Sequence, residues 1–202
     1  MDLRLALEIA QRYTPERMEH IYGTVDKATH LAERFSVDLY KCQIAAALHD
    51  LAKNIPRSKQ EAILQSYKPD YLSYSPNVYH GPVARYLLEW EFDITDRSIL
   101  NAVEYHVTGH PEMDEVLKVL YISDYIERGR THHPVHFCRY LSTIDLDLAV
   151  LGVSDFKLSY LRAKQADNIH PLTIQTHQSF LEKVGEAMYE SIKDHYQRHF
   201  GR

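Results

Sequence analysis

The amino-acid sequence predicts an all-α protein, a helical bundle folded as a single domain. Apolar residues recur at helical spacing through long segments, and no segment sustains the apolar–polar alternation of a half-buried strand. Glycine is also scarce, with 7 among 202 residues. The length suits one substantial domain over residues 1–202, and no repeat or linker divides it.

Cap and turn signals place the helices of the first half. Thr14 and Pro15 mark a helix start, since Thr caps helices and Pro suits the first helical turn. Pro56 follows the apolar run CQIAAALHDLA, and the Tyr-, Pro- and Ser-rich segment 67–79 predicts a loop. The sequence HGP then opens the next helix. We expect helices near 2–12, 14–35, 38–52, 58–66 and 80–91.

The second half continues the helical pattern. The sequence TGHP at 108–111 breaks it, because Gly and Pro both interrupt helices. We expect helices near 96–106, 114–127, 133–151, 155–165 and 174–198.

Composition excludes several classes of protein. A formal net charge of -5 argues against general nucleic-acid binding, which needs a positive surface. No apolar run approaches the roughly 18 residues of a membrane span, and the charged N-terminus does not resemble a signal peptide. Cys42 and Cys138 are far apart in the sequence and indicate neither a disulfide scaffold nor a thiolate metal site. We therefore expect a cytoplasmic protein with no membrane or nucleic-acid partner.

The adjacent pair His49-Asp50 ends a helix that is otherwise nearly all apolar. Burying an imidazole and a carboxylate is costly unless they are paired or bind a metal. Alone, the pair is weak support for a site, because a histidine at a helix end beside an Asp–Lys surface pair is the more frequent explanation of such a dipeptide.

Four further residues have a similar setting. Asp124 is a lone carboxylate in the apolar stretch VLYISDYIERGR, and His20 lies near the apolar face of its helix. His80 begins one predicted helix and His106 ends another. Each is more often an ordinary core or surface residue. Together with His49 and Asp50 they form the kind of set from which a helical bundle builds an internal metal site.

The ligand types restrict the metal. Imidazole and carboxylate ligands without thiolate favour a catalytic Fe, Mn, Ni, Co or Zn ion over a structural zinc site. Six ligands suit two ions about 3.5–4 Å apart that share Asp50 as a bridge. The alternative is one ion on four ligands, with the other two histidines contacting substrate.

Basic residues accompany these ligands at helical spacing. Arg17 precedes His20 by three residues, and Lys53 follows Asp50 by three, so both should flank the metal. Arg130 follows six residues after Asp124. Ordinary surface salt bridges explain any one of them, but their shared placement indicates an anionic substrate such as a phosphate ester or anhydride.

The order His20, His49-Asp50, Asp124 resembles the HD superfamily of metal-dependent phosphohydrolases. The finer similarity is to the bacterial YqeK-like symmetrical diadenosine tetraphosphate hydrolases. It is carried by RMEHIYGTV, AALHDLAK, YHGPVARYLL, EYHVTGHPEM and LYISDYIERGR, which follow the family's order and spacing from about residue 16 to 130. FCRYLSTIDLDLAV also resembles the family.

The resemblance implies an HD-type domain with core motifs at about 16–130 and C-terminal helices at about 133–202 packed on it. It implies hydrolysis of diadenosine tetraphosphate to two ADP, and iron bound by His20, His49, Asp50 and Asp124. It also implies that nucleotide phosphates, or in part a second metal, are contacted by Arg17, Lys53, His80, His106 and Arg130.

The family places part of the nucleotide against a late segment, here HPLTIQ. The resemblance therefore implies nucleotide contacts from His170, Thr173 and Gln175, although this segment departs from the family's usual Pro- and Tyr-containing pattern.

These residues suggest a mechanism as a hypothesis. A metal-bound hydroxide attacks one of the two inner phosphates, with Asp50 orienting the nucleophile. Lys53, together with Arg17 and Arg130, neutralises charge on the phosphate oxygens. His80 or His106 protonates the leaving ADP, which is already a good leaving group.

Alternatives stay open at this stage. The same site could act on a nucleoside monophosphate, a deoxynucleoside triphosphate or guanosine tetraphosphate. The chain could also bind nucleotide without turnover, whereas a purely structural bundle leaves two buried carboxylates unexplained. The sequence does not determine the metal, the number of ions, the residues that recognise the base, or the oligomeric state, for which a homodimer is one option.

Overall fold

The computed structural model describes residues 1–132, 134–165 and 168–200, and every regular element within these ranges is helical. The all-α prediction is confirmed. Three short 3₁₀ turns cover Pro15–Arg17, Pro69–Ser73 and Pro76–Val78. The α-helices are α1 (Leu3–Tyr13), α2 (Met18–Phe35), α3 (Leu39–Leu48), α4 (Arg57–Tyr67), α5 (His80–Trp90), α6 (Arg97–Tyr105), α7 (Glu115–Ile126), α8 (Pro134–Leu141), α9 (Leu146–Ala163), α10 (Pro171–Val184) and α11 (Glu186–Phe200).

Aspartate caps begin many of these helices. Asp96, for example, accepts hydrogen bonds from the backbone N–H groups of Ser98 and Ile99 at the start of α6. Such a cap satisfies backbone donors that the first helical turn leaves without a partner. Because α6 runs from this cap to His106, the cap fixes the starting point of a helix that ends at the candidate site. Asp2, Asp38, Asp114 and Asp145 cap α1, α3, α7 and α9 in the same way.

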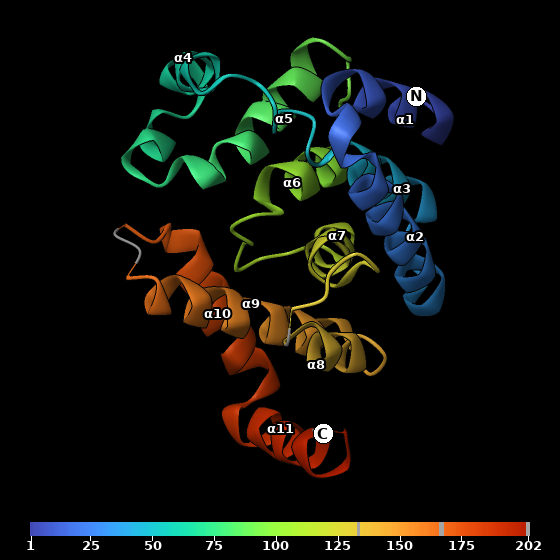
Figure 1. Ribbon diagram of the computed structural model, residues 1–202, viewed down its shortest axis with the longest axis vertical. Helices are drawn as coiled ribbons and strands as arrows, with labels where there is room; N and C mark the ends of the chain where they lie inside the picture. The colour runs from blue at the N-terminus through green and yellow to red at the C-terminus, as the bar shows by residue number, and fades with distance from the viewer. Residues whose placement is uncertain (133, 166–167, 201–202) are drawn as a thin grey trace.

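Helices α3 and α7 lie at the centre of the N-terminal part and are buried along most of their length. Helix α3 packs against α1, α2, α6 and α7, and α7 packs against α2, α6 and α9 (Figure 1). Buried apolar residues form one core that extends from Ala6 to Tyr189. A polar side chain at the end of a central helix is therefore held rigidly by close packing on all sides.

The C-terminal helices α8 to α11 and the N-terminal helix α1 lie on opposite sides of α7 (Figure 1). Helix α9 packs on α7, α8 and α10, and α11 follows at the end of the molecule opposite the N-terminus (Figure 1). In the described ranges, none of the helices combines the length and the apolarity needed to cross a bilayer.

Two predicted helix boundaries are wrong. The sequence pattern predicts helices over 133–151 and 155–165, but the break lies at 142–145 and one helix, α9, covers Leu146–Ala163. The reason is Asp145, whose side chain accepts a hydrogen bond from the backbone N–H of Leu148 and so starts a new helix. Residue 133, like 166–167 and 201–202 of the predicted domain, lies outside the described residues.

The predicted helix over 174–198 is in fact two helices, α10 and α11, which meet at Gly185. Gly185 has φ +88°, a conformation that side chains with a Cβ rarely adopt, and its N–H closes the end of α10 on the carbonyl of Leu181.

Candidate metal centre

The ends of α3, α5 and α6, together with positions within α2 and α7, bring the predicted His and Asp side chains to one place. Asp50, the second residue beyond the end of α3, lies at the centre and is 2 % exposed. Its Oδ2 atom lies 3.6 Å from Nε2 of His20 and 3.3 Å from Nε2 of His49. These two ring nitrogens are 3.2 Å apart. One oxygen of the carboxylate thus faces one pair of histidines.

The other oxygen of Asp50 faces a second pair of histidines. Its Oδ1 atom lies 3.3 Å from Nε2 of His80 and 3.9 Å from Nε2 of His106. These two nitrogens are 3.1 Å apart. His80 begins α5 and His106 follows the end of α6, so the close packing of these two helices sets the pair. Asp50 therefore lies between two histidine pairs, as a bridging ligand does.

Asp124 joins the first of these pairs from α7. Its Oδ1 atom lies 3.2 Å from Nε2 of His20 and 3.9 Å from Nε2 of His49. The lone carboxylate in an apolar helix thus faces the same point as Asp50.

Hydrogen bonds on the far edges of the rings orient three of the four histidines. The Nδ1–H of His49 donates to the carbonyl of Ala46 at 2.8 Å, and that of His106 donates to the carbonyl of Val103 at 2.7 Å. The Nδ1 atom of His20 lies 3.3 Å from Oε1 of the buried Glu127. In a neutral ring with Nδ1 protonated, the lone pair of Nε2 is available to a metal ion bound beside Asp50.

The electrostatics of the pocket favour ionised carboxylates. Burial opposes ionisation of Asp50, but the neighbouring His49 and hydrogen bonds from histidines outweigh it, so its pKa is well below the ordinary value. The pKa of Asp124 is likewise well below its ordinary value, because its hydrogen bond with His20 and nearby positive charges outweigh burial.

The histidines differ from one another. Burial lowers the pKa of His80. The pKa of His106 is well below its ordinary value, because burial and the nearby His80 and His49 all disfavour its charged form. Burial also acts to lower the pKa of His49, but the charge of Asp50 outweighs it and the pKa is raised. A metal ion would displace the proton of His49 on binding, since only neutral imidazole is a ligand.

The donor set fits divalent metal ions. Two groups of residues offer ligand atoms that all lie within 4.8 Å of one another: His20, His49 and Asp50, and Asp50, His80 and His106. Imidazole and carboxylate donors of this kind suit Fe, Mn, Co, Ni or Zn. The geometry is thus suited to one ion or to two that share Asp50.

The three predicted basic residues flank this centre. Arg17 donates from Nε to Oδ2 of Asp50 at 2.6 Å, and Nη2 of Arg130 lies 2.9 Å from Oδ1 of Asp124. The ammonium of Lys53 lies 3.4 Å from the ring nitrogens of His80. Its pKa is lowered, because burial of the ammonium and the nearby Arg17 outweigh the attraction of Asp50.

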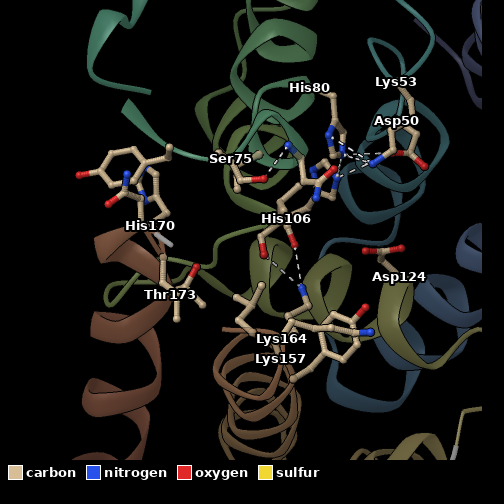
Figure 2. A pocket seen from close by; sticks show the side chains of 18 of the residues that line it. Asp50, Lys53, Ser75, His80, His106, Asp124, Lys157, Lys164, His170 and Thr173 are labelled. Carbon is tan, nitrogen blue, oxygen red and sulfur yellow. Dashed lines mark hydrogen bonds and ion pairs between the residues drawn. The ribbon is translucent and has the colours of Figure 1, made fainter. Parts of the chain in front are cut away.

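The centre opens into a cavity of about 460 Å³ (Figure 2). Its walls include His170 and Thr173 from the predicted nucleotide-binding segment, and Tyr74 from the Tyr-rich segment 67–79, whose ring centroid lies 4.5 Å from that of His170. Gln175 does not line the cavity and is exposed. It lies two residues beyond Thr173 on α10, which turns it roughly 200° around the helix axis.

Sequence reasoning missed three residues at this site: Glu127, Lys157 and Lys164. Glu127 contacts His20. Lys157 lies in α9 and Lys164 directly follows it; these two lysines of the α9 region line the cavity. The burial of Lys157 lowers its pKa to about 8. Glu127 follows Asp124 by three residues and so shares its helix face, which is a signal that could have found it. The lysines carry no local signal, because only tertiary packing brings α9 to the cavity.

Comparisons with known proteins agree with this geometry. The HD domain family matches residues 17–129. The chain is 37% identical over 145 residues to "Bis(5'-nucleosyl)-tetraphosphatase, symmetrical" of Bacillus subtilis, covering 71% of this chain and 78% of that one. It is 28% identical over 179 residues to the protein of the same name from Halalkalibacterium halodurans, covering 87% and 95%.

A solved structure from Clostridium acetobutylicum, described as a "predicted HD superfamily hydrolase involved in NAD metabolism", superposes with a TM-score of 0.84. It shares 29% identity and covers 91% of this chain and 98% of its own. The family match spans more than half of the chain and includes every residue of the two ligand groups. The chain therefore belongs to the HD domain family.

Proposed function

We propose that the chain hydrolyses diadenosine tetraphosphate symmetrically, so that one water and one substrate molecule give two molecules of ADP. The observation that carries the proposal is the position of Asp50 between two histidine pairs at the base of a cavity with cationic walls. The relatives named as symmetrical tetraphosphatases support the choice of substrate.

In this proposal His20, His49, Asp50 and Asp124 hold one divalent ion. His80 and His106, with the second oxygen of Asp50, either hold another ion or contact the substrate. Iron is the metal we expect, with Mn, Ni, Co or Zn as substitutes. A divalent ion bound here would supply a Lewis acid and a water of lowered pKa next to the attacked phosphorus.

The chain's own side chains position and neutralise the phosphates. Arg17, Lys53 and Arg130 surround the centre on the cavity side and can bind phosphate oxygens as their charge grows in the transition state. Arg17 and Arg130 also hold Asp50 and Asp124 in place. Symmetrical products require cleavage of the central anhydride, so these cations must hold an inner phosphate closest to Asp50.

The lowered pKa values of His80 and His106 bear on the acid suggested from the sequence. Neutral histidines are poor proton donors but good ligands, so we assign both a binding role. The departing ADP phosphate is a good leaving group and does not require a strong acid. The adenosine portions would reach the outer cavity, near His170 and Thr173.

The proposal extends to the whole chain. We propose that the C-terminal helices belong to the same domain as the HD core, because α9 packs on α7 and lines the cavity. The cytoplasmic location and a homodimeric state stay predictions from the sequence.

The test is product analysis with a small nucleotide panel, after the metal content of the purified protein has been measured. Incubation with diadenosine tetraphosphate should give only ADP by chromatography. ATP plus AMP would contradict symmetrical cleavage. Turnover of a nucleoside monophosphate, a deoxynucleoside triphosphate or guanosine tetraphosphate in its place would move the assignment to another HD phosphohydrolase. Tight binding without turnover would indicate a nucleotide-binding module.

A further inference from the structure

The cavity has a second cationic wall that does not belong to the family-matched segment 17–129. Lys157 and Lys164 of the α9 region line the cavity on the side opposite Lys53 and His80 (Figure 2). Helix α9 brings them there by packing on α7, which carries Asp124.

Lys157 is held firmly at this wall. Its ammonium lies 3.3 Å from the backbone carbonyls of His106 and Val107, and 3.9 Å from the centroid of the Tyr121 ring. The carbonyls and the ring face restrict the ammonium to the cavity wall without neutralising its charge. No carboxylate forms an ion pair with Lys157 in the part of the chain that the structure describes.

The charges that line the cavity do not balance. Two carboxylates, Asp50 and Asp124, are paired with Arg17 and Arg130. Among the described lining residues no third carboxylate occurs, so Lys53, Lys157 and Lys164 add positive charge that nothing in the wall offsets. This excess occurs in a chain with a net charge of -5. A cavity of this kind is complementary to a ligand with several negative charges spread along its length.

We propose that Lys157 and Lys164 form a second phosphate subsite, which holds the part of a phosphate chain that extends away from the Asp50 centre. The inference rests on the proposed function and makes the α9 region responsible for preferring long phosphate chains. Arg17, Lys53 and Arg130 hold the phosphate at the centre. The two lysines of the α9 region contact phosphates further along the chain, which a nucleotide with a single phosphate does not reach.

The test uses Lys164→Gln and Lys157→Gln in the full-length protein with its metal bound. Lys59→Gln is the matched control, since Lys59 is an exposed lysine of α4 that does not line the cavity. Lys157 also contacts the end of α6, so thermal melting of each variant is measured first. Lys164 is exposed, and its replacement should leave the melting temperature unchanged.

Binding is measured by calorimetry with two probes. The first is β,γ-methylene-ATP, whose phosphate chain is long and cannot be cleaved between the second and third phosphorus atoms. The second is AMP. Each lysine variant should weaken binding of the methylene analogue about tenfold, as expected for one lost charge-assisted contact, and that of AMP less than twofold. For diadenosine tetraphosphate, KM should rise by a similar factor with kcat within threefold.

Equal weakening of both probes, or no weakening beyond that of Lys59→Gln, would overturn the second subsite. The calorimetric comparison does not require the protein to cleave either probe. If the wild-type protein fails to cleave diadenosine tetraphosphate but binds the methylene analogue through the two lysines, the proposed function fails and the subsite stands. If the wild-type protein cleaves the substrate and both variants bind the analogue unchanged, the subsite fails and the proposed function stands.

Discussion

Oε1 of Glu127 lies 3.3 Å from Nδ1 of His20, on the edge of the ring that faces away from Asp50. Glu127 is 3 % exposed, and Gly23 of α2 makes room for it, because a Cβ at that position would overlap the Glu127 carboxylate. A carboxylate in this position fixes the tautomer and the orientation of a metal-binding histidine and makes its other nitrogen a better ligand.

Glu127→Ala should therefore weaken metal binding about 10- to 100-fold. The dissociation constant is measured by competition with a coloured chelator. In the metal-free protein, the ¹⁵N signals of His20 should shift from one protonated nitrogen toward a mixture of tautomers. Glu127→Gln retains an acceptor and should restore part of the affinity. Glu33→Ala, an exposed residue further along α2, is the control. Unchanged metal affinity together with a lower melting temperature would leave Glu127 a purely structural role.

Asp50→Asn should remove bound metal and activity together, while the far-UV circular dichroism of the helices persists. The reason is that both histidine pairs depend on the same carboxylate charge. Full activity in a folded Asp50→Asn protein that lacks metal would contradict the mechanism.

The variant His106→Gln distinguishes one bound ion from two. Metal analysis should find one ion fewer than in the wild-type protein if the pair His80 and His106 binds metal. The metal content should be unchanged if that pair contacts only substrate.

Asp96 links stability to pH at the start of α6. Burial acts to raise its pKa, but the ammonium of Lys41 at 2.9 Å and the capped N–H groups of α6 outweigh burial and lower it. A lowered pKa means that the ionised cap stabilises the fold at neutral pH, and that this contribution is lost as the pH falls below the ordinary value of 3.8.

Asp96→Ala should therefore lower the free energy of unfolding by about 1 kcal/mol at pH 7, the typical contribution of a helix cap. The difference from wild type should shrink as the pH falls below the ordinary value of 3.8, where the cap takes up a proton. Urea unfolding of both proteins at several pH values measures this difference in the free energy of unfolding. A difference that stays constant down to the lowest pH at which the protein folds would show that the carboxylate charge is not involved.

Three of the candidate ligand residues stand out in the sequence because each is a local anomaly. Asp124 is the lone carboxylate in an apolar helix, and His49-Asp50 ends another, so the cost of burial marks them without knowledge of the fold. The spacing of Arg17 from His20, and the shared placement of Arg130 with the other basic residues, indicated the same site, and the resemblance to the HD superfamily implied the same contacts. The ion pairs of the two arginines with Asp50 and Asp124 are consistent with that assignment.

Other features depend on contacts that no local pattern encodes. Lys157 is an ordinary lysine in its own helix and reaches the cavity only because α9 packs on α7. Asp145 and Gly185 did carry local signals, a helix cap and a helix terminator, but the apolar periodicity continues through both positions and masked them. Gln175 is the opposite case. The resemblance placed its segment at the cavity, and His170 and Thr173 do line it, but the turn of the helix directs Gln175 away.

The spacing of His80 and His106 rests on a close approach of α5 to α6 at Gly81. A Cβ at this position would overlap the backbone carbonyl of Glu104, which cannot move aside as a flexible side chain can. Gly81→Ala should therefore push the helices apart and lengthen the 3.1 Å separation between the two histidine nitrogens. Alanine favours helices over glycine by up to about 1 kcal/mol, so a net loss of stability would mean that the overlap outweighs this gain.

We expect Gly81→Ala to lower the free energy of unfolding by about 1–3 kcal/mol, the usual cost of overpacking, and to reduce activity further than stability alone explains. Gly152→Ala is the matched control. It is also a buried helical glycine, but its Cβ would meet only the end of the Leu141 side chain, which can rotate away. Denaturant unfolding and kcat are measured for both variants. Equal effects of the two substitutions would mean that the approach of α5 to α6 does not set the histidine pair.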